Sequence, residues 1–526
     1  MKGNLSSWMT ILPVNRKILT WFVLTILIAL AGMAAVTYQS REGPGVTGDS
    51  VYYVMGARNI LSGNGYSRYS GGWEPIPITG FPPVFSILLA GAGFFGGDLF
   101  ESSRIINILL FGANIFLAGL LTFRNTRTIV PAIISSLLIM ASASMIHYHS
   151  WVMTEGLFIF ITLLSLFTLV RYFETDKLLY LVITGLLMTA STLTRYVGLA
   201  SVGMAGLGIL LLSRLGWKKR LVHIVILGLV SVTPFILWLY RNSVVSNSLV
   251  NRQIVFHFMS RDLVLGFISE AVSWFAPRIL NLPRLLDAAL FLIFAGVIPL
   301  LFIITEVKHG VLRKDLAWQG FKILPFLILL FIPTYVILLV LNTTLLDAST
   351  SLTATHRYLL PIYVMMVIML TCMVYRLVAN KSSGVKITSL VIAVFLIGFF
   401  LSESISSLRG PVKDMGYTDL KHSWTSVVGT LNQIDSSRLF ISDNVELFYF
   451  LAGRPAYAFP ISYDNYTQQE RQDYNLQIAK AKNRLEQGAI IVLFYPEEGQ
   501  KKALDQLGVE TLYEFPQAIF YHLPGK

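Results

Sequence analysis

The placement of charge along residues 17–405 constrains the fold more than any other feature of this chain. Long apolar runs fill this part of the sequence, and short segments between them hold most of its charged residues. The whole chain is 54% hydrophobic and only 13% charged, with a mean hydropathy of +0.64. A water-soluble fold of this composition could not solvate its surface, so lipid must be the main solvent. The sequence therefore predicts an α-helical polytopic membrane protein.

A helix that crosses a bilayer needs roughly 20 apolar residues. Eleven segments meet this requirement: 17–37, 104–123, 129–146, 152–173, 177–194, 197–213, 221–240, 287–305, 322–342, 357–377 and 386–405. The run 83–97 is shorter and ends in two glycines, so we expect a re-entrant or interfacial helix there. The division at Arg195 competes with a single long tilted helix. We therefore expect about eleven transmembrane helices.

The positive-inside rule orients these spans. With the N-terminus in the cytoplasm, the inner loops collect lysine and arginine, for example at 214–220 and 308–314. The outer loops contain no lysine; they are 38–103, 147–151, 241–286 and 343–356. An odd number of spans then places the tail outside the cytoplasm. The net charge of +12 indicates membrane orientation and contact with anionic lipids, and nucleic-acid binding is not expected.

The chain divides into a transmembrane domain, 1–408, and a tail, 409–526. The tail is less apolar, and its pattern predicts strands at 438–442, 489–494 and 518–521 with helices at 466–487 and 497–507. We expect a small extracytoplasmic α/β domain that serves as a lid or docking platform. The single cysteine, Cys372, excludes a disulfide framework and a thiolate zinc site. The first apolar run predicts a retained span, not a cleaved signal peptide.

The first outer loop carries an isolated acid, Asp49, followed by Tyr52 and Tyr53 and later by Glu74. Loops of this length without regular structure are usually functional. An acid held against apolar helices at a membrane surface suits general-base chemistry. The simpler interpretation is that Asp49 caps the helix that follows it. Both roles can coexist in one side chain.

The second outer loop is short and leads into Glu155 at the start of the next span. An acid in the first turn of a transmembrane helix is costly, so a functional role is the default hypothesis. The alternative is favourable contact with the helix dipole. His147 and His149 have a spacing that could bind a divalent metal ion with a carboxylate. Interfacial or hydrogen-bonded histidines explain that pair more simply, so we assign no cofactor and keep a divalent metal ion as the alternative.

Arginines mark three other outer ends of the spans, namely Arg195, Arg241 and Arg357. Arginine without lysine suits bidentate binding of phosphate. For any one of them, the simpler interpretation is a side chain that reaches up to the lipid head groups. Three on the same predicted face as two acids favour a phosphate-bearing ligand.

These residues, in this order, resemble the GT-C superfamily of polytopic membrane glycosyltransferases. The chain is most similar to bacterial and archaeal relatives of protein O-mannosyltransferases and of the lipid A aminoarabinose transferase. The resemblance covers residues 17–405. Its marks are Gly48-Asp49-Ser50 with Tyr52-Tyr53, Pro82-Pro83, Arg104 with Asn107, Thr154-Glu155-Gly156, Thr194-Arg195-Tyr196, Trp238 with Arg241-Asn242, and His356-Arg357-Tyr358.

The resemblance implies a function and roles for these residues. The donor would be a sugar on a polyprenyl phosphate, and the acceptor an envelope lipid, glycan or protein at the outer face of a prokaryotic cell membrane. Asp49 and Glu155 would take the two acidic positions of the family. Arg357 would meet the donor phosphate, with Arg241 and Arg195 as weaker candidates. The substrate loops would include Tyr52, Tyr53, Glu74, His356 and Tyr358.

Two other classes of protein fit parts of the pattern. A transporter or flippase of lipid-linked sugars would place ionisable groups at mid-membrane, often in inverted repeats. These spans are largely free of charge at mid-depth, and the two halves of the chain do not look alike. A non-catalytic envelope assembly protein would keep the fold but tolerate neutralisation of both acids. In addition, the family's paired acids after the first span are Asp49-Ser50 here, which counts against a protein acceptor.

Overall fold

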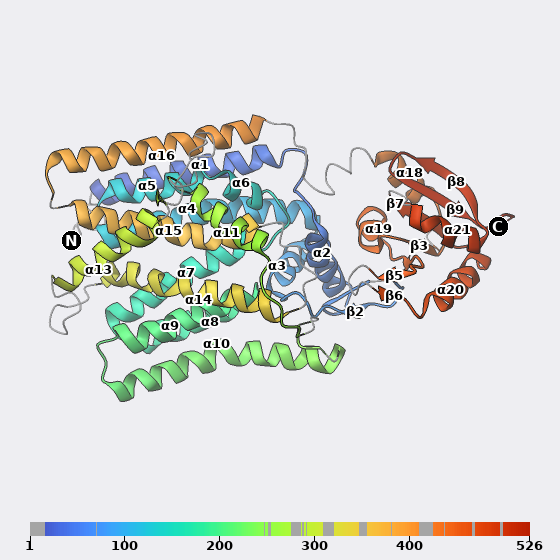
Figure 1. Ribbon diagram of the computed structural model, residues 1–526, viewed down its shortest axis with the longest axis horizontal. Coiled ribbons are helices and arrows are strands. Elements are labelled where there is room, and N and C mark those ends of the chain that lie inside the picture. The colour runs from blue at the N-terminus through green and yellow to red at the C-terminus, as the bar shows by residue number, and fades with distance from the viewer. Residues whose placement is uncertain are drawn as a thin grey trace, which may run out of the picture.

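The computed structural model places a helical bundle at one end of the molecule and a small α/β unit at the other (Figure 1). It describes residues 16–525 except for 70, 247, 251–253, 275–285, 287–288, 291, 309–319, 347–354, 380, 410–423, 436, 465–468 and 495–497. The predicted inner loop with Arg313 and Lys314, most of the outer loop 343–356, and the start of the predicted tail domain therefore lie largely outside the described residues.

Within the part of the chain that the structure describes, seven helices are long and apolar enough to cross a membrane. They are α1 (Arg16–Gln39), α4 (Leu99–Thr126), α7 (Glu155–Thr175), α10 (Trp217–Ser246), α14 (Leu324–Leu345), α15 (Thr355–Val378) and α16 (Ser383–Arg409). An eighth span is formed if the bent pair α5 (Ile129–Met140) and α6 (Ala143–His149) counts as one; the two meet at 60°. The protein is a multi-pass membrane protein.

The predicted count of eleven spans stays a prediction. Two of the expected spans are α8 (Leu178–Thr192) and α9 (Leu199–Leu212), which have only 15 and 14 residues. The break between them confirms the division at Arg195, because the chain leaves α8 and enters a short 3-10 turn, η1 (Tyr196–Gly198). The region 287–305 contains a π-helical turn, η3 (Ile293–Val297), and α13 (Ile298–Lys308). Before it lies α11 (Arg261–Ser273).

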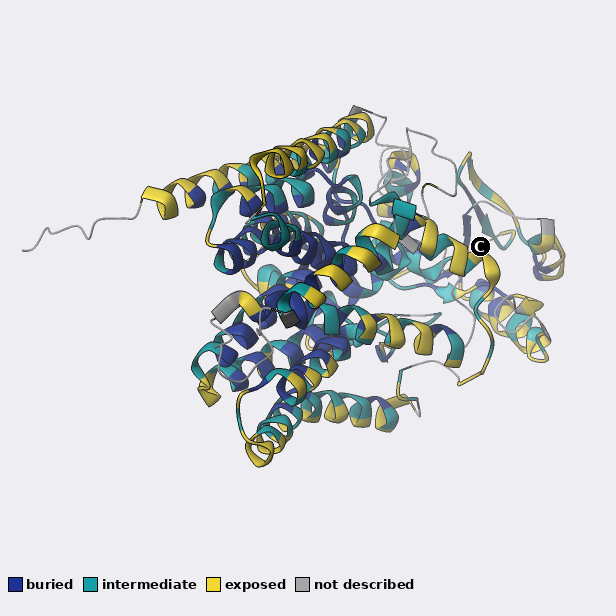
Figure 2. Ribbon diagram, turned by 60° about the vertical axis from the view of Figure 1, so that its left-hand side comes forward, coloured by how far each residue is buried: buried dark blue, intermediate teal, exposed yellow. Residues whose placement is uncertain are grey.

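Burial separates the inner helices from the outer ones. In the apolar windows of α7 and α15, 78% of the residues are buried, whereas the figure is 11% in α10 and α16. Figure 2 shows the same contrast between dark interior ribbons and yellow peripheral ones. An exposed apolar helix surface is stable only against lipid, since water would penalise it. Glycines such as Gly119 on α4 bring helices close: a Cβ there would lie 2.4 Å from Oγ of Ser136 on α5.

The segment 38–103, predicted as the first outer loop, is folded at the end of the bundle that faces the α/β unit (Figure 1). It contains α2 (Gly48–Leu61), a two-stranded ribbon of β1 (Ser67–Arg68) and β2 (Ile76–Pro77), and α3 (Val84–Phe94). α3 has 11 residues and ends beside Phe94 and Phe95, which are 78% and 87% exposed. A helix of this length is too short to cross a bilayer, as expected for 83–97.

The α/β unit is built on a five-stranded sheet with strand order β4-β3-β7-β9-β8. The strands are β3 (Phe440–Ser442), β4 (Tyr457–Ala458), β7 (Ile490–Phe494), β8 (Glu510–Phe515) and β9 (Ala518–His522). β3 is parallel to β4 and β7, and β9 is antiparallel to β7 and β8. A small ribbon pairs β5 (Tyr463–Asp464) with β6 (Gln469–Glu470).

Helices pack around this sheet. They are α18 (Thr425–Gln433), α19 (Val445–Ala452), α20 (Tyr474–Glu486) and α21 (Lys501–Leu507). The sheet has apolar clusters built around Phe440 and Phe520 and around Ile491 and Leu493. The three strands predicted from the sequence are present as β3, β7 and β9, whereas β8 was not predicted because its residues alternate weakly and are mostly exposed.

Candidate functional site

Four segments that are far apart in the sequence bring two acids and two arginines together. Nη1 of Arg357 donates to Oδ2 of Asp49 at 2.7 Å, and its Nε donates to Oε1 of Glu155. Arg195 also donates to Oε1 of Glu155 through Nη1, and the same nitrogen contacts Oγ1 of Thr154 at 3.1 Å. Arg357 therefore bridges the two acids, and Glu155 bridges the two arginines. The four formal charges cancel.

Burial gives the two acids different environments. The Glu155 side chain is 1% exposed, while the side chain of Asp49 is 34% exposed. Arg357 and Arg195 are 11% and 13% exposed. Oε2 of Glu155 has no hydrogen-bond partner among the described residues. Glu155 thus acts as a buried counter-ion that holds both arginines in place, and Asp49 is the acid that an incoming molecule can reach.

Local capping explains where the two acids sit. α2 begins at Gly48, and its N-cap is Thr47, whose backbone N–H donates to Ser50 Oγ at 3.0 Å. The interpretation of Asp49 as a helix cap is therefore wrong, because Thr47 is the N-cap. Asp49 lies in the first turn of α2, close to the positive end of the helix dipole. Glu155 is the first residue of α7. Its pairing with two arginines goes beyond a dipole contact.

Two asparagines on α4 hold the chain that leads into Glu155. Asn107 Nδ2 donates to the Trp151 carbonyl at 2.7 Å, and Asn114 Nδ2 donates to the Gly156 carbonyl at 3.0 Å. The fully buried His149 pairs through Nδ1 with the Met145 carbonyl at 2.7 Å, so its Nε2 faces Asn114 as an acceptor. Both ring nitrogens of His149 are thereby engaged.

Metal binding by His147 and His149 gains no support from this arrangement. Among the described residues, no three His, Cys, Asp or Glu side chains gather closely enough to hold a metal ion. His147 instead packs its ring against Trp151, with centroids 5.1 Å apart.

Arg241 lies apart from the bridged acids and braces the first outer loop. It donates to the Ile78 carbonyl at 2.8 Å and to the Tyr66 carbonyl at 3.2 Å. The neighbouring Asn242 donates to the Thr79 carbonyl at 3.2 Å. The structure therefore separates the three predicted phosphate-binding arginines into a pair that contacts Glu155 and a third that supports the loop.

The predicted substrate-loop residues are distributed around the site. Tyr53 is 3% exposed and packs edge-on against Phe85 in the core of the loop, while Glu74 points to solvent. Tyr358 follows Arg357, with the guanidinium carbon of each of Arg357 and Arg195 at 6.0 Å from its ring centre. His356 lies in the first turn of α15, and its side chain is outside the described residues.

Tyr52 connects the site helix to the α/β unit. Its hydroxyl donates to Oε1 of Glu446 on α19 at 3.2 Å and accepts from Nη1 of Arg68 at 2.5 Å. Arg68 also lies 3.7 Å from Glu446. Further along α2, Arg58 lies over the Tyr449 ring at 5.5 Å from its centre. α19 therefore holds the helix whose first turn carries Asp49.

No protein-family model matches this chain, and no curated protein matches it in sequence. Its fold does match solved structures. ArnT from Cupriavidus metallidurans in the apo state superposes with a TM-score of 0.61 and 12% identity, over 96% of this chain and 98% of that chain. The oligosaccharyltransferase AglB from Archaeoglobus fulgidus has a TM-score of 0.51 and 13% identity, over 90% and 69% of the two chains. The arabinofuranosyltransferase AftD from Mycobacteria has a TM-score of 0.51 and 11% identity, over 95% and 41%.

The chain has the GT-C fold.

Sequence reasoning gave no role to several residues that build the site. Asn107 and Thr154 marked the resemblance but received no role, and Asn114 was not named. These residues had a signal, because polar side chains inside apolar runs are rarely neutral in a membrane. Tyr335 on α14 had none: its hydroxyl donates to the Tyr358 carbonyl at 2.8 Å, a contact between two different helices. Glu446 was equally hidden, because its partner Tyr52 is 394 positions away.

Proposed function

We propose that this GT-C chain is a membrane glycosyltransferase that moves a sugar from a polyprenyl-phosphate donor to an envelope acceptor at the outer face of the membrane. One observation carries the proposal: a single arginine bridges a buried acid and an accessible acid at the end of the helical bundle. A reaction that removes a proton from one substrate while a phosphate leaves the other needs such a base and such a cation side by side.

Asp49 is the proposed general base. Its carboxylate takes the proton of an acceptor hydroxyl while the acceptor oxygen bonds to the anomeric carbon of the donor sugar. The bond from that carbon to the phosphate oxygen breaks, and the polyprenyl phosphate leaves with the bonding electron pair. Attack from the side opposite the phosphate inverts the anomeric centre. Arg357 and Arg195 stabilise the charge of the departing phosphate.

Glu155 makes this arrangement possible by orienting the arginines. Its carboxylate is engaged by both guanidinium groups, so it fixes their planes and offsets part of their charge. A buried guanidinium pair without a counter-ion would repel itself and be costly to desolvate. Glu155 is therefore proposed as a positioning residue and not as a base.

The Asp49–Arg357 ion pair implies an order of events. In the resting site, Arg357 holds the carboxylate that the reaction needs as a base. A phosphate binds a guanidinium fork with more hydrogen bonds than one carboxylate oxygen can accept. Donor binding is therefore proposed to draw Arg357 away from Asp49 and leave this carboxylate available for the acceptor hydroxyl.

The identity of the donor lipid is supported by the neighbours in fold. One structure of ArnT was solved bound to undecaprenyl phosphate, and AglB was solved with a dolichol-phosphate. The sugar is left open. For the acceptor, an envelope lipid or glycan is favoured over a protein, because Ser50 stands where the protein O-mannosyltransferases would carry a second acid.

The test is a transfer assay with the full-length protein in proteoliposomes. It is supplied with a panel of polyprenyl-phosphate hexoses and pentoses and an envelope lipid extract, and products are identified by mass spectrometry. Asp49→Asn should lower transfer by about 10²- to 10⁴-fold, as expected for loss of a general base. Glu42→Gln, which neutralises an acid of the same loop with 47% of its side chain exposed, is the matched control. Normal transfer by Asp49→Asn would show that the assigned base is wrong.

A further inference from the structure

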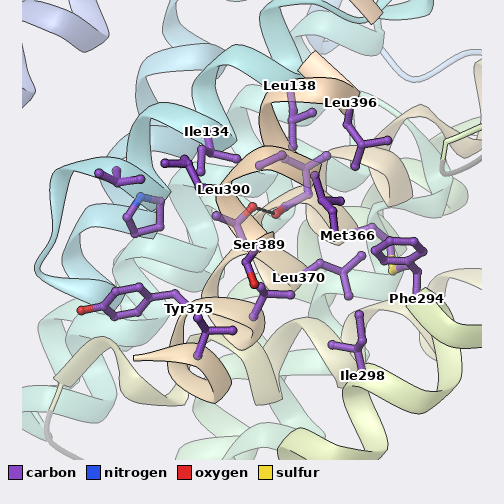
Figure 3. Close-up of a pocket in the computed structure, with 18 of the residues that line it drawn as sticks. Ile134, Leu138, Phe294, Ile298, Met366, Leu370, Tyr375, Ser389, Leu390 and Leu396 are labelled. Atoms are coloured by element: carbon purple, nitrogen blue, oxygen red, sulfur yellow. Dashed lines mark hydrogen bonds between the residues drawn. The ribbon is translucent and has the colours of Figure 1, made fainter. Parts of the chain in front are cut away.

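An apolar cavity of about 750 Å³ lies beside α15 in the helical bundle. We call it the tail cavity. α5, η3, α13, α15 and α16 contribute its walls, and Figure 3 shows their side chains pointing into one space. Labelled examples are Ile134, Leu138, Phe294, Met366, Leu370 and Leu396. This volume lies within the range of sites that enclose small organic ligands. In a membrane span, such a space suits an alkyl chain.

A smaller polar cavity of about 70 Å³ adjoins the tail cavity, because Trp274, Tyr363 and Phe400 line both. We call it the head chamber. Its polar lining consists of Ser142, Ser144, Ser273, Glu270 and Glu403. Glu270 is 4% exposed, so its carboxylate is held inside the protein. The chamber has room for about five groups of the size of a water molecule.

The head chamber lies near the bridged acids. Leu360, one turn after Arg357 on α15, lines it. Ser144 on α6 lines it as well, and the same short helix carries Tyr148. A head group held in the chamber is therefore close to the proposed reaction centre.

The chemistry of the two places is complementary. Arginines surround the bridged acids, so phosphate is attracted there. Glutamates line the head chamber, where carboxylates repel phosphate and accept hydrogen bonds from hydroxyl groups. Serine hydroxyls can donate or accept, and so can complete the contacts of a polyhydroxyl head.

We propose that the tail cavity and the head chamber bind the acceptor, a lipid with an uncharged, hydroxyl-bearing head group. Its alkyl chain lies between α5, α15 and α16, and its hydroxyls contact Glu270 and Glu403. The role as acceptor rests on the proposed glycosyl transfer, whereas the binding itself does not. The site keeps the acceptor apart from the donor phosphate and presents a hydroxyl toward the accessible acid.

The experiment uses the full-length protein in nanodiscs and a 1-O-alkylglycerol with a diazirine on its chain, because the glycerol head is of the size that the head chamber admits. After irradiation, mass spectrometry should find adducts on peptides of α5, α15 and α16. Excess alkylglycerol without the diazirine should suppress these adducts, and an alkyl phosphate of equal chain length should not. Ala393→Trp, which fills the tail cavity, should reduce labelling by about tenfold, since the ring overpacks the space that the chain needs. Val391→Trp is the matched control, because Val391 is 60% exposed on the same helix.

A second variant tests the head chamber without filling any space. The double change Glu270→Gln and Glu403→Gln should weaken labelling by the alkylglycerol and allow the alkyl phosphate to compete. Competition by alkyl phosphate in the unchanged protein, or equal labelling of the two tryptophan variants, would overturn the proposal. Specific labelling of a protein that transfers no sugar would support this site and count against the proposed function. Transfer without labelling would overturn this site alone.

Discussion

Neutralising Asp49 should make the protein bind a lipid phosphate more tightly while it stops sugar transfer. In the resting site, Asp49 competes with the incoming phosphate for Arg357, at an N–O distance of 2.7 Å. Two unit charges 4 Å apart attract by about 4 kcal/mol at an effective dielectric constant near 20. Because the Asp49 side chain is 34% exposed, water returns most of that energy when the pair separates, and a net value of about 1 kcal/mol is appropriate.

One kcal/mol corresponds to about a fivefold change in an equilibrium constant. The Kd of undecaprenyl phosphate should therefore fall by about fivefold in Asp49→Asn, and kcat should fall by about 10²- to 10⁴-fold. Native mass spectrometry of the protein in nanodiscs, with the lipid titrated at low salt, measures the first quantity. The gain in affinity should shrink as salt is added, since exposed charges are screened. Unchanged or weaker binding of the lipid by Asp49→Asn, relative to Glu42→Gln, would refute the competition for Arg357.

Four further predictions concern other parts of the structure. Glu155→Gln leaves two buried guanidinium groups without their counter-ion, so the melting temperature should drop, in line with a loss of about 3–5 kcal/mol. Arg357→Lys keeps the charge but reaches only one acid, and kcat in the transfer assay should fall by about 10²- to 10³-fold. Glu446→Ala removes the acceptor of Tyr52 and should lower kcat a few-fold at unchanged KM for donor, whereas Glu446→Gln should not. Burial raises the pKa of Asp443. The stability that this residue contributes is therefore present below an unfolded pKa of about 3.9 and is lost as pH rises through the folded pKa. Hydrogen exchange of β3 and β7, corrected for intrinsic rates, measures this pH dependence of stability, and Asp443→Asn should abolish it.

How far the sequence predicts the site differs between its acids and its arginines. Asp49 and Glu155 were recognisable because an acid beside an apolar run has few structural reasons to be there. The arginines were not distinguishable from one another, since each could equally reach up to the lipid head groups. In the structure, Arg357 and Arg195 contact Glu155, and Arg241 contacts loop carbonyls. Their local sequences contain no trace of that difference.

The fold shows a similar division. The break at Arg195 and the short helix at 83–97 were predicted, because length and glycine content are local properties. The bend of 60° between α5 and α6 was not, and neither was the shortness of α8 and α9 as spans. Hydropathy reports how apolar a segment is; it does not report where its helix starts, stops or tilts.

By itself, the sequence determined that this chain is a membrane protein and predicted which loops lie on the same side of the membrane. The reason is that the free energy of placing a residue in a bilayer depends mainly on that residue and its neighbours along the chain. Only the tertiary structure decided that Arg357 bridges Asp49 and Glu155, although Asp49 lies 308 positions away. An ion pair depends on distances of a few ångströms between side chains. Those distances are set by the packing of α2, α7 and α15 against the rest of the bundle, which no local pattern encodes.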